Sequence, residues 1–250
     1  MKITSLIKWL LGLGLFAVLV MAGAVYLMAC KAPSQYRPEL LDAPAREAAA
    51  KRFAKKTLEE FGNQAQGSES FSISFSQQEI NEYFASVDEI AAQAPNGRSG
   101  QVRQLLADAG ISAPMVVLND GLMTMMVHLD EHEKILSVDI GMVQEDDGRL
   151  RLSLCGARIG DLPVPAGMAQ DGLERIRHGL DQAGAMDEPA QRLTIEHVAR
   201  GLATAVRAIG RDPIDLSLPL RINGRGVRIS RIVLAPEQLT LRFVPFEAGE

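Results

Sequence analysis

The chain has 250 residues, a net charge of −5, and two cysteines, Cys30 and Cys155. Two cysteines exclude a disulfide framework, and Cys155 is expected to be a free thiol. Because the only basic residues before position 31 are Lys2 and Lys8, the remainder is more acidic than the whole chain, which argues against nucleic acid as a partner. This length is compatible with one or two domains.

The first thirty residues predict a membrane anchor. No residue from Trp9 to Cys30 is charged, and a helix of this length measures about 33 Å, enough to cross a hydrocarbon core. Lys2 and Lys8 precede it, so the positive-inside tendency places the N-terminus in the cytoplasm and residues 31–250 outside it. We therefore expect a single-pass protein of the cell (inner) membrane, attached through residues 9–30.

A cleaved lipoprotein signal is the alternative. The sequence "LMAC" at 27–30 approximates a bacterial lipobox that ends in a lipidatable Cys30. Met28 is unusual for that motif, and the apolar run is longer than the roughly 7–15 residues of a signal peptide's apolar region. We favour a retained anchor over residues 1–30, and both interpretations attach the rest of the chain to the outer side of the membrane.

The next segments predict a stalk, a helix and then the start of the main domain. Residues 31–46 hold three prolines and no apolar periodicity, which is typical of a stalk, and an Ala- and Lys-rich helix follows over about 44–62. We accordingly divide the outer part into a stalk and helix, 31–67, and an extracytoplasmic α+β domain, 68–250.

The domain begins with a strand that runs directly into a helix. Phe71, Ile73 and Phe75 alternate with serines, the period-2 pattern of a strand buried on one face. Ser76 and Glu79 form a capping box, so the helix begins at once, with Ile80, Phe84, Val87 and Ala91 on one side. This junction predicts a corner that places strand and helix on a shared apolar layer.

A short helix over about 101–109 precedes an antiparallel meander. Its strands are expected at 114–119, 122–130, 134–144 and 149–158, separated by the turn sequences "NDG", "EHE" and "EDDG". Period-2 alternation places one set of apolar residues on a single face of this sheet. That set is Met123, Met125, Val127, Leu136, Val138, Ile140, Met142, Leu150, Leu152 and Leu154.

The same order of helix and strands then recurs. "GDLPVPAG" at 160–167 ends the meander and leads into a helix near 166–183, and a second helix is expected over 194–209. Strands resume at 214–222, where Leu216 and Leu218 alternate with polar residues, and at 226–234 and 238–244. The chain is therefore predicted to be α+β with antiparallel sheets.

The sequence offers little support for catalysis. "HLDEHE" at 128–133 contains the metal-ligand types His128 and His132, but residues four apart converge on a helix and not on a strand and turn. A solvated hairpin turn is the favoured interpretation, with no metal and no cofactor. Nucleophile-elbow, phosphate-loop and zinc-protease motifs are absent, so we expect a non-enzymatic protein. Cys155 is interpreted as a small strand residue rather than a reactive thiol.

The apolar composition points instead to a hydrophobic ligand. Methionines 115, 123, 125, 126 and 142 gather in the meander, and this flexible side chain suits either a solid core or a cavity for acyl chains. Each long strand has one apolar face, which must meet helices, another sheet or a ligand. Aromatic residues make up only 5%, which leaves little for sugar stacking.

Three stretches carry a family resemblance: "QEINEYF" at 78–84, "VVLNDGLMTMMV" at 116–127 and "IGDLPVP" at 159–165. With the anchor, they make the chain resemble bacterial members of the tubular lipid-binding (TULIP, BPI-like) superfamily, particularly the YceB-like lipoproteins and the YpmS-like membrane-anchored proteins. The resemblance implies a strongly curved antiparallel meander sheet wrapped around helices, with an apolar groove for lipid and no catalytic residues. We expect the groove to be lined by the apolar set of the meander with Leu216 and Leu218.

These observations predict a membrane-anchored extracytoplasmic protein that binds lipid or another amphiphile. The alternative is a non-enzymatic envelope scaffold or assembly protein with a solid core, which would bind a protein partner through a sheet edge or an apolar patch. An envelope hydrolase would require convergent carboxylates or an activated Cys155.

Overall fold

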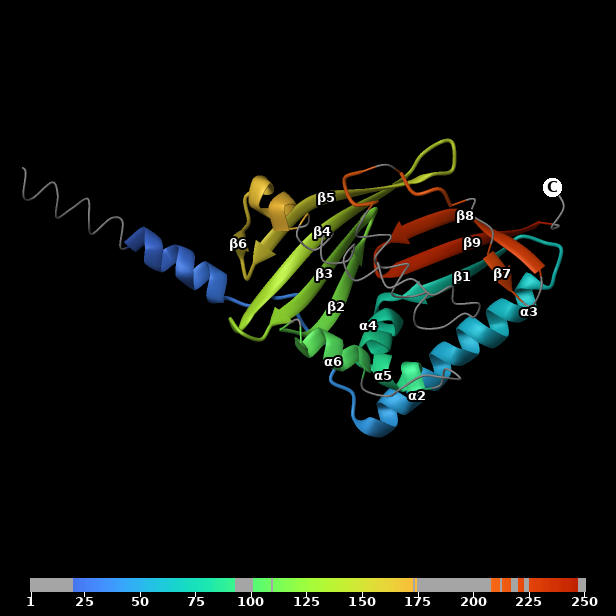
Figure 1. Cartoon of the computed structure of the whole chain (residues 1–250), viewed down its shortest axis with the longest axis horizontal. Helices are drawn as coiled ribbons and strands as arrows, with labels where there is room; N and C mark the ends of the chain where they lie inside the picture. The colour runs from blue at the N-terminus through green and yellow to red at the C-terminus, as the bar shows by residue number, and fades with distance from the viewer. Residues whose placement is uncertain are drawn as a thin grey trace, which may run out of the picture.

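The structure, a computed structural model, is α+β, as the sequence predicts, with two antiparallel sheets and several helices (Figure 1). It describes residues 20–92, 101–108, 110–172, 174, 208–211, 213–216, 220–222 and 225–246. Predictions that fall elsewhere lie outside the described residues: the anchor before residue 20, most of the two helices expected over 166–183 and 194–209, and Leu218.

The helices lie mainly before the first long meander. A helical segment covers residues 20–30, and of the described helices none is both long and apolar enough to span a bilayer. The Asp42 side chain accepts a hydrogen bond from the backbone N–H of Ala45 and so starts α2. The labelled helices are α2 (Ala43–Ala54), a π-helical segment η1 (Lys55–Glu60), α3 (Phe61–Ala65), α4 (Gln77–Ala85), α5 (Val87–Ala92) and α6 (Gln101–Asp108), and residues 166–172 are also helical.

The strands form two open sheets. Sheet A has the order β1-β9-β8-β7, with β1 (Phe71–Ser76), β7 (Leu220–Ile222), β8 (Arg225–Ala235) and β9 (Gln238–Phe246). Sheet B contains the four predicted strands of the meander and a short fifth strand within the segment expected to end it, in the order β2-β3-β4-β5-β6. Its strands are β2 (Ile111–Asn119), β3 (Leu122–Leu129), β4 (Lys134–Gln144), β5 (Leu150–Ile159) and β6 (Leu162–Pro163).

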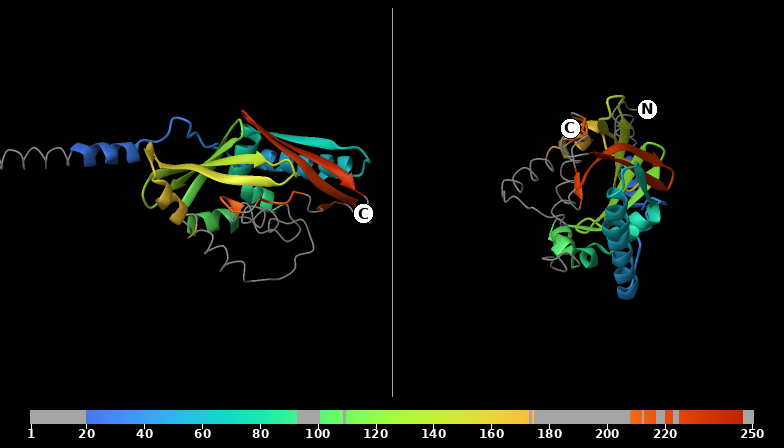
Figure 2. Two further views of the ribbon diagram at one scale, coloured as in Figure 1. Left: turned by 90° about the horizontal axis from the view of Figure 1, so that it is seen from above. Right: turned by 90° about the vertical axis from the view of Figure 1, so that its right-hand side faces the viewer.

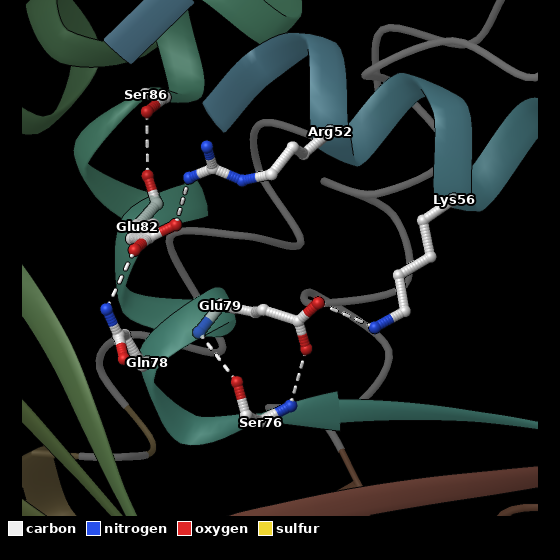
Figure 3. A network of polar contacts seen from close by, with 7 residues as sticks. All are labelled: Arg52, Lys56, Ser76, Gln78, Glu79, Glu82 and Ser86. Carbon is white, nitrogen blue, oxygen red and sulfur yellow. Dashed lines mark hydrogen bonds and ion pairs between the residues drawn. The ribbon is translucent and has the colours of Figure 1, made fainter. Parts of the chain in front are cut away.

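The predicted corner between β1 and α4 is confirmed. The Glu79 N–H donates to Ser76 Oγ at 3.1 Å, and the Ser76 N–H donates to Glu79 Oε2 at 2.8 Å, so both halves of the capping box are present. Lys56 Nζ lies 2.7 Å from Glu79 Oε1, and Arg52 pairs with Glu82 (Figure 3). The cap thus also joins α4 to the long helix α2–η1.

Two amide side chains of α4 form hydrogen bonds with backbone groups of β2, at the free edge of sheet B. Asn81 is only 5% exposed; its Nδ2 donates to the Val116 carbonyl at 3.0 Å and its Oδ1 accepts from the Val116 N–H at 2.8 Å. One helical turn earlier, Gln77 Oε1 accepts from the Leu118 N–H at 2.7 Å. Because β2 is an edge strand, these bonds take the place of a neighbouring strand and cover the edge.

Side chains and backbone bonds connect the two sheets. Gln144, at the end of β4, donates to the Ser230 carbonyl at 2.8 Å and accepts from the Ile232 N–H at 3.2 Å. These contacts fall where the pairing of β8 with β9 shifts register, between Ile229 and Arg231. A bulge leaves backbone groups without ladder partners, and Gln144 satisfies them. At the hairpin tip, the Gly121 N–H donates to the Leu234 carbonyl at 3.1 Å.

The expected stalk differs from a free spacer over its first part. Tyr36 donates its hydroxyl to the Ala113 carbonyl at 3.0 Å and packs against the buried cluster of Met115, Met126 and Ile135. The Arg37 N–H lies 3.2 Å from Met115 Sδ. Residues around Tyr36 therefore cover one side of sheet B, and the chain cannot extend there as a stalk without uncovering these apolar side chains.

The hydroxyl group of Tyr83 is buried beneath α2. The Tyr83 ring packs on Phe53 at 4.7 Å and on Phe75 at 6.4 Å between centroids, and its buried hydroxyl has no hydrogen-bond partner among the described residues. Burial, together with the charge of Glu79, raises the pKa of Tyr83 to about 12. Because an unpaired buried hydroxyl is costly, Tyr83→Phe should raise the free energy of unfolding by about 1 kcal/mol in urea denaturation. A decrease of that size would contradict this prediction.

Candidate functional site

The strand register brings the predicted apolar residues of the meander to one side of sheet B. Directly paired residues of antiparallel strands share a face. The pairs are Met123 with Ile140, Met125 with Val138, Val127 with Leu136, Ile140 with Leu154, and Met142 with Leu152, while Leu150 pairs with Gln144. We call this surface the apolar face; Val116 and Leu118 of β2, which pair with Met125 and Met123, also belong to it.

A bulge in β5 adds two residues that the alternation alone does not predict. The β4–β5 pairing shifts between Asp139 and Ile140, so Cys155 has no direct partner. Beyond it, Ala157 pairs with Val138 and Ile159 pairs with Leu136, which places these odd-numbered residues on the apolar face. A single inserted residue reverses the parity of a strand, and the sequence gives no marker for it except Gly156, beside the bulge.

One part of the apolar face belongs to a buried core. Ile140, Leu150, Leu152 and Leu216 are at most 8% exposed and pack together with Ile209. Leu150 and Ile214 exchange backbone hydrogen bonds of 2.8 and 2.7 Å, which holds this cover against β5. Four of the twelve residues expected to bind lipid therefore have protein neighbours over most of their surface.

The central methionines are half-buried between two clusters. Met123, Met125 and Met142 contact the core just described, and they also contact the cluster of Val116, Leu118 and Leu234. Ile80 and Phe84 of α4 pack against that second cluster, as the helical spacing predicts. Val138 and Leu154 complete this central region and are likewise half-buried.

The remaining apolar residues lie at the other end of the strands, near the β3–β4 turn. Val127, Leu136 and Ile159 are half-buried, and none belongs to a buried cluster formed by the described side chains. They occupy adjacent register positions on β3, β4 and β5. The apolar face is thus a continuous strip, covered at the β4–β5 turn end and partly exposed at the β3–β4 turn end.

The opposite face of sheet B carries a polar network and a small core beneath Tyr36. Thr124 donates to Asp139 Oδ1 at 2.7 Å, and Arg158 Nη2 lies 3.1 Å from the same oxygen. Nearby, Met115 and Met126 are at most 3% exposed beneath Tyr36. Two of the five methionines singled out from the sequence therefore belong to the core of the opposite face and not to the apolar face.

The histidine cluster at the β3–β4 turn is a hydrogen-bonded corner. His128 Nδ1 lies 2.8 Å from Asp130 Oδ1 and 3.3 Å from Ser112 Oγ, and Ser112 also bonds to Asp130. These bonds, from Ser112 first and then His128, lower the pKa of Asp130. In a catalytic triad the nucleophile and the carboxylate bond to different ring nitrogens of the histidine, whereas Ser112 and Asp130 both contact Nδ1 of His128. Among the described residues, no group of three or more His, Cys, Asp or Glu side chains is placed to hold a metal ion.

Both cysteines are exposed free thiols. Cys155 Sγ lies 3.8 Å from Ser153 Oγ, on the side of the sheet opposite the apolar face. Cys30 Sγ, at the end of the helical segment 20–30, lies 2.5 Å from Lys134 Nζ. The two thiols are separate: Cys155 lies on the opposite face, whereas Cys30 contacts Lys134 at the β3–β4 turn end of sheet B.

No protein-family model matches the chain, and no curated protein does either.

Proposed function

We propose that the chain is a membrane-anchored extracytoplasmic protein that binds a lipid or another amphiphile on the apolar face of sheet B. The observation that carries the proposal is the continuity of this face. It extends across β3, β4 and β5 and ends in the partly exposed residues Val127, Leu136 and Ile159. An exposed apolar strip on one side of a protein is costly in water, and an acyl chain would remove it from solvent.

The chemistry of the face suits an acyl chain. Its exposed part is aliphatic, and its central part is rich in methionine, whose unbranched side chain adapts to ligands of varying shape. The described charged side chains that form ion pairs lie elsewhere, for example Asp139 with Arg158 on the opposite face. A strongly curved sheet B wrapped around helices, the geometry that the resemblance implies, would deepen the strip into a groove.

Native mass spectrometry tests this proposal on the full chain, released from membranes in a mild detergent. We expect a population with an added mass that corresponds to a lipid and that is removed by a harsher detergent. An unliganded mass in several mild detergents would overturn the proposal. The same spectrum gives the mass of the mature chain, which distinguishes a retained Met1 from a chain that begins at a lipidated Cys30.

A scaffold with a solid core is the second candidate, favoured by a separate observation. Ile140, Leu150, Leu152 and Leu216 are buried against Ile209, so the face is already filled by protein at one end. In this case Val127, Leu136 and Ile159 would form a small patch for an envelope protein partner. This candidate would be favoured if the unliganded chain captured a protein partner and added lipid did not displace that partner.

A further inference from the structure

The C-terminal end of the helical segment 20–30 is fixed to sheet B. The Asp161 N–H, in the β5–β6 turn, donates to the Met28 carbonyl at 2.9 Å. The Lys31 ammonium lies 2.6 Å from Asp161 Oδ2, and the neighbouring Gly160 N–H donates to the Ile135 carbonyl at 2.7 Å. The last turn of a helix leaves carbonyl groups without intrahelical partners, and the turn of sheet B supplies one. Figures 1 and 2 show the helix leaving the domain at this end of the sheet.

Gly160 makes the close approach possible. Its φ of +59° lies in the left-handed region, and a Cβ atom there would lie 2.6–2.7 Å from the carbonyl oxygens of Met28, Ala29 and Lys31. Those three oxygens are backbone atoms, so they cannot move aside without displacing the helix end. The position therefore requires glycine for a tertiary reason, in addition to the conformation of the turn.

The residues around this junction are those that proteins place at the membrane–water boundary. Lys134 Nζ, at the start of β4, lies 5.0 Å from the centroid of the Tyr26 ring, and Lys31 follows directly after the helix. Tyrosine and lysine are favoured at the level of the lipid headgroups, where the polar tip meets water and the apolar part meets lipid.

The helix itself presents apolar side chains that the described protein does not cover. Val20, Met21, Val25 and Leu27 are between 43% and 68% exposed. The sequence continues upstream without a charged residue as far as Trp9. A helix with this apolar surface, preceded by this uncharged sequence, is suited to a lipid environment.

We infer that the end of sheet B that carries the β3–β4 and β5–β6 turns lies against the bilayer surface, so that the apolar face opens directly toward lipid. The inference rests on the proposed membrane anchor. Val127, Leu136 and Ile159 occupy this same end of the strands, next to Lys134 and Gly160. The covered end of the face, around Leu150, points away from the bilayer. An acyl chain would then pass between membrane and protein without crossing water.

Surface charge does not hold this end at the membrane. The β3–β4 turn carries the exposed carboxylates Glu131 and Glu133, which anionic headgroups repel. The Lys31–Asp161 ion pair is largely exposed and contributes little. The backbone contacts at Gly160 fix the orientation, which is therefore expected to persist at high salt and in zwitterionic lipid.

The test measures which end of sheet B is near the bilayer. The full chain, carrying Cys30→Ser and Cys155→Ser, is reconstituted into phosphatidylcholine nanodiscs and labelled with a fluorophore at His132→Cys or at Asp146→Cys. Both positions are exposed, and they flank opposite ends of β4, about 33 Å apart. A headgroup spin label should quench the probe at 132 several times more strongly than the probe at 146. Hydrogen exchange at the Asp161 amide checks that the junction remains formed in this background.

Gly160→Ala, with Gly148→Ala as the matched control, tests the junction. Gly148 also has a positive φ, +83°, but an added Cβ there would meet no atom within 4 Å. We expect Gly160→Ala to reduce the quenching difference and to expose the Asp161 amide to exchange, while the control keeps both. Equal quenching at 132 and 146 in the unsubstituted junction, or an unchanged difference in Gly160→Ala, would overturn the inference. A chain that does not insert into nanodiscs would instead refute the anchor; a chain that inserts and retains lipid with equal quenching refutes only the orientation.

Discussion

Asn81→Ala is expected to lower the free energy of unfolding by about 2–6 kcal/mol, because it leaves two buried backbone groups of Val116 unpaired. Asn81 is the only side chain in the described structure that bonds both the N–H and the carbonyl of that residue. At 5% exposure, water does not readily replace the amide. Each unpaired group costs about 1–3 kcal/mol, and the lost side-chain packing adds to this cost.

Urea denaturation of the full chain in detergent measures this effect. Gln78→Ala is the matched control, since Gln78 lies on the same helix, is exposed, and bonds, within the described part of the chain, only to the Glu82 side chain. It should change the stability by less than about 0.5 kcal/mol. Asn81→Asp should destabilise more than Asn81→Ala, since a buried carboxylate would face the Val116 carbonyl. If Asn81→Ala matched the Gln78→Ala control, the amide would not be closing the edge of β2.

Met142→Asp is expected to abolish lipid retention in a folded chain. Met142 is a half-buried residue of the apolar face beside its covered end, and it contacts both clusters that border the face. A carboxylate there would have to be buried against an acyl chain without a partner, at a cost of several kcal/mol. This position is preferable to Leu152, which is 3% exposed and whose substitution by Asp would unfold the core.

Val143→Asp provides the matched control. Val143 is the next residue of β4, is 60% exposed and points to the opposite face, so the same charge is added at the same place in the sheet. Native mass spectrometry should show lipid on the Val143→Asp chain and none on the Met142→Asp chain, both with cooperative thermal transitions. Lipid retained by a folded Met142→Asp chain would remove the methionine-lined part of the apolar face from the site.

Features that depend on local spacing were predictable from the sequence. The capping box needs only Ser76 and Glu79 three residues apart, and the structure forms both of its bonds. The meander follows from alternation and turn residues, and its apolar set shares one face because paired strands keep a period of two.

Features that depend on contacts between segments distant in the sequence were not predictable. The helical pattern of α4 does not single out Gln77 and Asn81, because nothing in it shows that this helix lies beside the edge of β2. The proline-containing segment after residue 30 reads as a stalk, although Tyr36 completes a buried cluster. The bulge at Cys155 reverses the parity of β5 without a strong local marker.

The sequence by itself determined which side chains of sheet B are apolar and that they face one way, since that property depends only on the period of an extended chain. Tertiary structure alone decided which part of this face is covered. Ile209, Ile214 and Leu216 come back to the strands from more than fifty residues further along the chain and bury one end, while the end at Gly160 is joined to the N-terminal helix. Such contacts arise from the overall path of the chain, which no local pattern encodes.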